Sequence, residues 1–98
     1  MNTVPPASPQ PPSQGQHLAT ISHEGRFWDV YLEFEDEPRR PTTHRARLCF
    51  FPGDPADGEK AVRTTVIIIE DTFEEAMAKA RRLDEHQLQG LLRSTLPD

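Results

Sequence analysis

The chain has 98 residues, of which 35% are hydrophobic and 28% charged, with a formal net charge of −5 at pH 7. This length predicts one domain, and the acidic balance disfavours non-specific binding to nucleic acid or to an anionic membrane. The longest apolar run, Val66–Ile69, is far shorter than the roughly 20 residues of a membrane-spanning helix. Because Cys49 is the single cysteine, no internal disulfide is possible. We therefore expect a small soluble cytoplasmic protein.

The first sixteen residues, Met1–Gln16, contain five prolines and no charged side chain. Such a segment buries too little apolar surface to offset the entropy lost on ordering. We therefore expect a disordered tail with polyproline II character, without the basic and apolar regions of a signal peptide. Its two PxxP spacings have no adjacent arginine or lysine, so we interpret it as a linker or leader. The predicted domain is residues 17–98.

A four-stranded antiparallel meander is predicted next. Arg26–Glu35 alternates apolar and polar side chains, and a strand turns successive side chains to opposite faces. Gly25 can supply the positive φ of a tight hairpin before this strand, and the prolines of Asp36–Thr43 break the ladder after it. The β-branched residues of Val62–Glu70 favour a last strand. The expected strands are His17–Ser22, Arg26–Glu35, His44–Phe51 and Val62–Glu70, with the turn-rich segment Pro52–Ala61 between the last two.

Two helices are predicted after the strands. Thr72 and Glu75 fit a capping box, and acidic side chains near the start with basic ones near the end suit the helix dipole. The spacing of the apolar residues indicates a first helix over about Thr72–Leu83 and a second over Glu85–Ser94. Gly90 weakens the second helix by about 1 kcal/mol relative to alanine. The two helices are either continuous or separated by a kink.

Together these elements predict an α+β fold, in which one or two C-terminal helices pack on one face of the antiparallel meander as a two-layer sandwich. If Glu35 lies opposite Arg45, charged groups and apolar groups both match between the second and third strands, and a one-residue slip would exchange the faces. The expected pairs are Glu35–Arg45, Phe34–Ala46, Glu33–Arg47, Leu32–Leu48, Tyr31–Cys49, Val30–Phe50 and Asp29–Phe51. The first helix is expected to cover Trp28, Val30, Leu32, Phe34, Leu48, Phe50, Val66 and Ile68.

The opposite side of this sheet, here called the second face, is also partly apolar. An antiparallel sheet with one solvated face normally carries polar side chains there. The second face instead includes Phe27, Tyr31, Cys49, Phe51, Ile67 and Ile69. Because an exposed apolar patch favours docking, we expect a non-enzymatic protein-interaction module that either forms a homodimer or binds another protein. The alternative is internal cover by the second helix or by the strand region around Leu18.

Residues that could carry chemistry form no catalytic, metal or cofactor signature. The four histidines and Cys49 lack the close pair spacings of a zinc site. The acidic residues between Glu33 and Glu37 are interpreted as a solvated edge rather than as a general acid–base pair. No glycine-rich phosphate loop with its lysine is present. We therefore expect neither enzymatic activity nor a cofactor.

A basic cluster supplies the alternative function, a nucleic-acid-associated regulator. Its arginines could contact phosphate, and the aromatic side chains of the second face could stack on bases. However, Asp29, Glu33 and Glu35 share that surface and would repel a phosphate backbone. Nucleic acid is therefore the less favoured partner. The cluster consists of Arg39, Arg40, Arg45 and Arg47.

One local resemblance concerns the junction between the last strand and the first helix. The segment Ile69-Glu-Asp-Thr-Phe-Glu-Glu-Ala76, leading into Ala80, resembles the strand-to-helix junction of HicB-like antitoxin domains, in which an Asp-Thr-x-Glu-Glu-Ala segment commonly follows a β-meander. The chain departs from that family because no strand is predicted after the helix and no DNA-binding segment is appended. No function is carried over from this resemblance.

Overall fold

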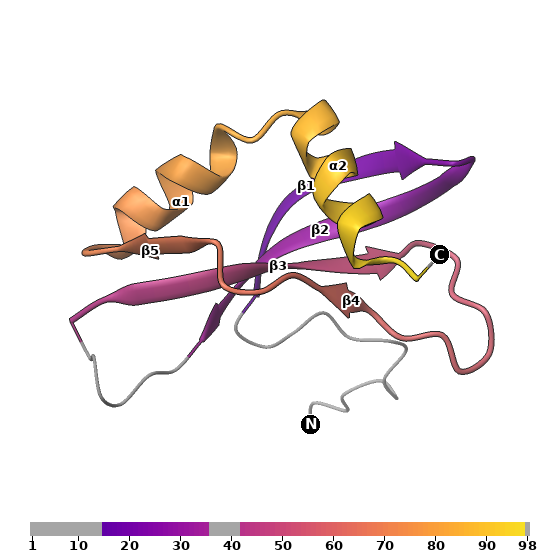
Figure 1. Ribbon diagram of the computed structural model, residues 1–98, viewed down its shortest axis with the longest axis horizontal. Coiled ribbons are helices and arrows are strands. Elements are labelled where there is room, and N and C mark those ends of the chain that lie inside the picture. The colour runs from indigo at the N-terminus through magenta and orange to yellow at the C-terminus, as the bar shows by residue number, and fades with distance from the viewer. Residues whose placement is uncertain (1–14, 36–41, 98) are drawn as a thin grey trace, which may run out of the picture.

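The computed structural model describes residues 15–35 and 42–97, which form an antiparallel sheet with two helices at its C-terminal end (Figure 1). This arrangement confirms the predicted α+β class. The strands are β1 (Gly15–His23), β2 (Arg26–Glu35), β3 (His44–Pro52), β4 (Val62–Arg63) and β5 (Ile68–Glu70), and the helices are α1 (Phe73–Arg81) and α2 (Glu85–Thr95). Most of the predicted N-terminal tail, including its PxxP spacings, lies outside the described residues, and β1 begins at Gly15 rather than at His17.

The sheet is a meander in the order β1-β2-β3, with β4 and β5 both paired to the outer side of β3. A two-residue turn joins β1 to β2, and both of its residues have positive φ: 50° at Glu24 and 79° at Gly25. Such turns match the twist of the flanking strands, so the predicted tight hairpin is confirmed. The β2–β3 register is also the predicted one, running from Trp28 opposite Pro52 to Glu35 opposite Arg45.

The prediction of one continuous strand over Val62–Glu70 is wrong. Cys49 lies opposite Arg63 and Ala46 opposite Ile68, so two residues of β3 face the four residues 64–67. Because the insertion adds two residues, the alternation of faces is preserved. Ile68 therefore remains in the core, where it is 3% exposed.

The break in the last strand has a local hydrogen-bonding cause. The Thr64 hydroxyl accepts a hydrogen bond from the Leu48 backbone N–H at 3.0 Å, in the place that a strand carbonyl would take. The Thr64 backbone N–H donates to the Leu48 carbonyl at 2.9 Å, and the Ile67 N–H donates to the Ala46 carbonyl at 3.0 Å. The chain thus stays attached to β3 without a regular ladder, so the polar groups of β3 remain satisfied.

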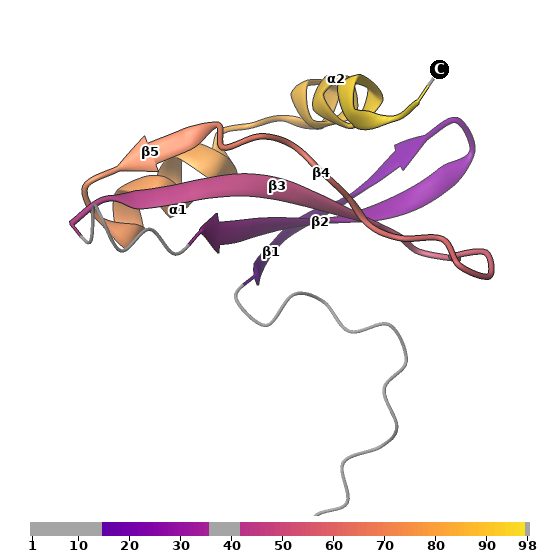
Figure 2. The same cartoon turned by 60° about the horizontal axis from the view of Figure 1, so that its bottom comes forward.

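Both helices pack on the same face of the sheet, and α2 lies across the strands near β4 and the β1–β2 hairpin (Figure 2). The prediction of one or two helices on one face is therefore confirmed with two, and the residues expected beneath the first helix belong to a core that both helices share, except Val66, which is not part of it. Leu88 and Leu92 of α2 are 3% and 0% exposed and belong to the same buried cluster as the α1 residues. That cluster contains Ile21, Trp28, Val30, Leu32, Ala46, Leu48, Phe50, Ile68, Ala76, Met77, Ala80, Leu88 and Leu92.

A complete capping box begins α2 rather than α1. The Asp84 side chain accepts from the Gln87 backbone N–H at 2.8 Å, and the Gln87 side chain accepts from the Asp84 backbone N–H at 2.9 Å. At α1 the Thr72 hydroxyl accepts from the Glu75 N–H at 3.0 Å, but the Glu75 carboxylate accepts from that same hydroxyl and not from the backbone. The cap at Asp84 makes α2 a separate helix, which can turn back onto the sheet.

Candidate functional site

The second face of the sheet lies opposite both helices. Phe27 is 66% exposed and Ile69 is 50% exposed, whereas Tyr31 and Phe51 are half-buried. The alternative prediction, that the second helix covers this face, is wrong, because the buried leucines of α2 lie in the core on the other side of the sheet. Among the described residues, no helix covers the second face.

Aromatic side chains occupy the end of the second face nearest the β1–β2 turn. The Tyr31 ring makes edge contacts with the rings of His17 and Phe51, with centroid distances of 5.2 and 6.3 Å. Asp29 lies beside them and accepts hydrogen bonds from the Thr20 hydroxyl at 2.7 Å and from the His17 ring at 3.2 Å. Burial, with a further contribution from the Asp29 charge, raises the pKa of Tyr31. Tyr31 therefore stays neutral at physiological pH and presents an apolar ring.

Cys49 lies opposite Tyr31 and is fully buried, although it belongs to the same face. Burial raises the pKa of the Cys49 thiol, partly offset by the charge of Arg63. Because the thiolate is the reactive form, Cys49 is suited to packing and not to nucleophilic chemistry.

The other half of the second face carries a clamp of charged side chains around Glu33. The Glu33 carboxylate accepts hydrogen bonds from Arg47 Nε at 2.6 Å and from Arg63 Nε at 3.0 Å, which joins β2, β3 and β4. Burial alone would raise the pKa of Glu33, but the hydrogen bonds from Arg63 and Arg47 outweigh it and hold this pKa below its ordinary value. Beside the clamp, Arg45 lies 3.9 Å from Glu35. The basic residues of this face therefore have carboxylate partners.

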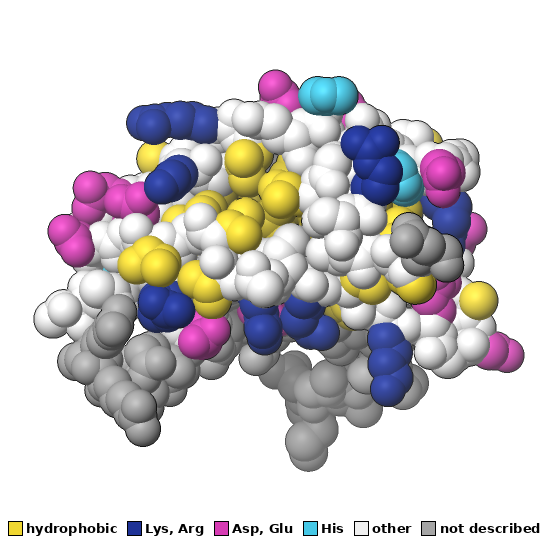
Figure 3. All heavy atoms as spheres, viewed as in Figure 1, with side chains coloured by type: hydrophobic (Ala, Val, Ile, Leu, Met, Phe, Trp, Pro, Cys, Tyr) yellow, Lys and Arg dark blue, Asp and Glu magenta, His cyan; other side chains and the backbone are white. Residues whose placement is uncertain are grey.

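The two isoleucines of the predicted site lie in different places. Ile69 is opposite Arg45, on the second face. Ile67 is in the irregular 64–67 segment and, with Leu91 and Thr95 of α2, lines a shallow hollow of about 300 Å³. Figure 3 shows apolar side chains gathered between the two helices and towards β5. The structure thus places Ile67 at the sheet edge beside α2, away from the aromatic end of the second face.

The four arginines of the predicted basic cluster also lie in different places. Arg39 and Arg40 lie outside the described residues. Arg47 is hydrogen-bonded to Glu33, and Arg45 lies near Glu35. Arg47 is therefore already neutralised within the chain, whereas Arg45 makes only a 3.9 Å contact with Glu35 and its buried Nε atom has no hydrogen-bond partner.

In the described part of the chain, neither edge of the sheet offers a long regular strand for pairing. The β1 edge is irregular between His17 and Ala19, and α2 caps it near the turn: Gln89 Nε2 donates to the Ser22 carbonyl at 2.6 Å, and the Ser22 N–H donates to Glu85 at 3.5 Å. The opposite edge is interrupted at residues 64–67. Bulges and covered backbone groups are the means by which proteins protect sheet edges from pairing with another chain.

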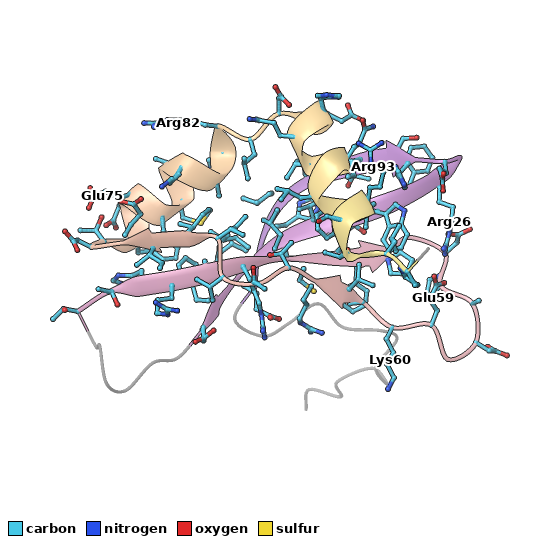
Figure 4. The ribbon with its side chains drawn as sticks, viewed as in Figure 1. Arg26, Glu59, Lys60, Glu75, Arg82 and Arg93 are labelled. Carbon is cyan, nitrogen blue, oxygen red and sulfur yellow. The ribbon has the colours of Figure 1, made fainter. Side chains whose placement is uncertain are left out.

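A further ion pair, which the sequence did not predict, fixes the loop at the aromatic end. The Arg26 guanidinium donates to both carboxylate oxygens of Glu59, at 2.8 and 2.9 Å, and contacts Asp54 at 3.4 Å (Figure 4). These hydrogen bonds, with another from the Ala56 backbone N–H, lower the pKa of Glu59 to about 2. The same guanidinium lies 5.2 Å from the centre of the Trp28 ring. The only sequence signal was the position of Arg26 two residues before Trp28, on the same face of a strand.

Comparison of the chain with known protein families, with curated proteins and with solved structures found no match. Within residues 15–35 and 42–97, no group of three or more histidine, cysteine, aspartate or glutamate side chains is placed to hold a metal ion. No helix in the described part of the chain is long and apolar enough to cross a membrane.

Proposed function

We propose that this chain is a small interaction module that docks a protein partner on the second face of its sheet. The observation that carries the proposal is the placement of both helices on the opposite face, which leaves Phe27 at 66% exposure among partly buried aromatic neighbours. Large aromatic side chains at the centre of a protein interface commonly supply much of the binding energy. Covering this face would remove them from water.

The charges of the second face favour a protein over a nucleic acid. A phosphate backbone requires cations that are free to pair with it, whereas Arg47 and Arg63 already share the Glu33 carboxylate. A backbone lying on this surface would also approach Asp29 and Glu35. A protein surface can match alternating charges of both signs with an apolar centre.

The protected edges of the sheet favour docking through the face. A partner that added a strand would need a row of free N–H and C=O groups. At Ser22 these groups are occupied by side chains of α2, and at residues 64–67 the ladder is broken. The face therefore remains as the larger regular surface of the sheet.

Photocrosslinking from the exposed Phe27 position tests this proposal. Benzoyl-phenylalanine in place of Phe27 keeps an aromatic ring at the exposed position, and the same group in place of Glu74, an exposed residue of α1, is the control. We expect discrete crosslinked species from position 27 in cells and few from position 74. Equal, diffuse crosslinking from both positions would refute the proposal, and crosslinks mainly to nucleic acid would favour the regulator instead.

A further inference from the structure

We infer that the occupant of the second face is a second copy of this chain, stacked face to face about a two-fold axis that runs along the strands between β2 and β3. This inference rests on the proposed function and adds the identity and orientation of the partner. Three features of the second face support it: its charge columns, its alternation of large and small side chains, and the hollow beside Gly53.

The charges of the second face form two parallel columns of opposite sign. Glu35 and Glu33 of β2 lie opposite Arg45 and Arg47 of β3, and Arg63 of β4 also reaches Glu33, whereas the third acidic residue of β2, Asp29, lies opposite Phe51. A two-fold axis along the strands exchanges the columns, so the acidic column of each copy lies over the basic column of the other. An axis across the strands would instead place acidic over acidic residues, at an energetic cost.

A closed two-fold axis allows no shift along its own direction. Residues that are cross-strand partners within one chain must therefore also face each other between the two copies. Glu35 lies opposite Arg45 in the β2–β3 register, so Glu35 of one copy lies over Arg45 of the second copy, and the reverse contact occurs as well. Every favourable charge contact is thus made twice.

Large and small side chains are paired across β2 and β3. Phe27 and Tyr31 of β2 lie opposite Gly53 and the fully buried Cys49, and Phe51 of β3 lies opposite the smaller Asp29. The two-fold axis places each of these aromatic side chains over a smaller residue of the other copy, which is how well-packed layers interdigitate. A complementary surface of this kind is what a symmetric contact requires of a single chain.

The hollow beside Gly53 provides the space for one of these contacts. A Cβ atom at Gly53 would lie 3.7 Å from the Phe27 Cβ atom, which places both residues on the same face. A shallow hollow of about 270 Å³ borders this position, lined by Gly25, Arg26, Phe27, Gly53 and Asp54. Phe27 of the second copy would meet the open side of this hollow.

The size of the face sets the strength of the expected dimer. Ten residues of β2 extend about 34 Å, and four strands about 4.8 Å apart give a width near 15 Å, so each copy would bury roughly 500 Å². The total of about 1,000 Å² is at the lower end of specific interfaces. An axis along the strands also keeps the two sheets nearly aligned, as in sandwiches. We therefore expect a weak, reversible dimer with a dissociation constant in the micromolar range.

Charge reversal at one cross-strand pair tests the inference. In Glu35→Arg both residues of the pair are positive, and in Arg45→Glu both are negative, so each variant alone places like charges together twice in its own dimer. An equimolar mixture restores opposite charges at both contacts, but only in the heterodimer. The replaced contact within the chain is long, at 3.9 Å, so both variants are expected to keep the fold, which circular dichroism verifies.

Sedimentation equilibrium from about 1 µM to about 500 µM measures the outcome. We expect dimerisation of the unchanged chain, about tenfold weaker self-association of each variant, and recovery in the mixture to within about threefold of the unchanged chain. A monomer at every concentration, unaltered self-association of the variants, or no recovery in the mixture would overturn the inference. If position 27 nevertheless crosslinks discretely to a different protein, the second-copy inference fails while the proposed docking face stands.

Discussion

Glu33 and Glu59 show two ways in which this small domain holds a carboxylate with arginines. Glu33 is 7% exposed and receives hydrogen bonds from two strands, whereas Glu59 lies in a turn and receives both of its guanidinium hydrogen bonds from Arg26. In both cases the hydrogen bonds favour the ionised form. Glu33 stabilises the centre of the second face, and Glu59 holds the 53–61 loop at its aromatic end.

The low pKa of Glu59 predicts a specific contribution to acid sensitivity. A carboxyl whose folded pKa is depressed stabilises the fold above its unfolded pKa, near 4.3, and loses this contribution as the pH falls towards the folded value, here about 2. The stability difference between the unchanged chain and Glu59→Gln should therefore shrink as the pH falls from about 5 to about 2. Denaturant unfolding across this range measures it.

Asp57→Asn is the matched control for this prediction, because Asp57 is an exposed carboxylate of the same loop. This variant removes one negative charge from the loop and none of the Arg26 hydrogen bonds to Glu59, so it separates the effect of those hydrogen bonds from that of net charge. A pH-independent difference for Glu59→Gln would contradict the role assigned to the Arg26 contacts.

Among the secondary-structure elements, the β2–β3 hairpin was predictable from the sequence and the last strand was not. Seven of the eight consecutive pairs joining β2 to β3 carry matching charge or apolar character, the exception being Asp29 opposite Phe51, so one register satisfies nearly all of them. The interruption at 64–67 depends instead on the Thr64 hydroxyl replacing a backbone acceptor for Leu48. The β-branched composition of this segment does not indicate that a hydroxyl will replace a backbone carbonyl as the acceptor, because threonine also suits a regular strand.

Like the interruption of the last strand, the position of α2 on the sheet was not predictable from the sequence. The spacing of Leu88 and Leu92 predicted an apolar side of the helix, but not which face of the sheet it would cover. That choice is made by the short connection after α1, where Arg82 is helical and Asp84 is extended. The turn directs α2 back to the face that α1 already covers. Hydrophobic periodicity reports the faces of an element and not the direction of the chain between elements.

Gly90 allows a direct test of α2 as an independently formed helix. The position lies within α2, and an added Cβ atom would meet no atom within 4 Å. Gly90→Ala should therefore raise the free energy of unfolding by about 0.5–1 kcal/mol, through helix propensity. Thermal and denaturant unfolding measure the change.

Gly25→Ala is the opposite control for the α2 prediction. Gly25 has a φ of 79°, a conformation that strains alanine even though the space around it is open, so this variant should be less stable than the unchanged chain. If Gly90→Ala also lowered stability, the helical surroundings assigned to Gly90 would be incorrect.

At the scale of the whole molecule, both helices cover one face of the sheet, and within residues 15–35 and 42–97 no helix covers the other. The alternation in the sequence predicted which residues share the second face, and the structure places Phe27, Tyr31, Phe51 and Ile69 there. It could not predict that Cys49 is fully buried within that face, because this depends on the positions of neighbouring side chains. Nor could it place Ile67 beside α2, because that follows from the irregular segment.

The division into two faces also explains how so small a domain can be stable while retaining apolar exposure. Both helices are used on one side, where the leucines of α2 complete the core. Within the described residues, no further helix is left to cover the second face. A domain of about 80 residues buries only about 60% of its unfolded surface, so its stability margin is small. Association would supply the missing burial.

The most direct measurement of whether the second face is covered is the thiol-labelling rate of Phe27→Cys, compared between intact cells and dilute purified protein. The native Cys49 is fully buried, so the unchanged chain provides the background, and Glu74→Cys on α1 corrects for the difference between cell and solution. If a partner covers the second face, position 27 should be labelled several-fold more slowly in cells than in dilute solution, after this correction. Equal corrected rates at positions 27 and 74 would show that the face is left open to water and that no partner docks there.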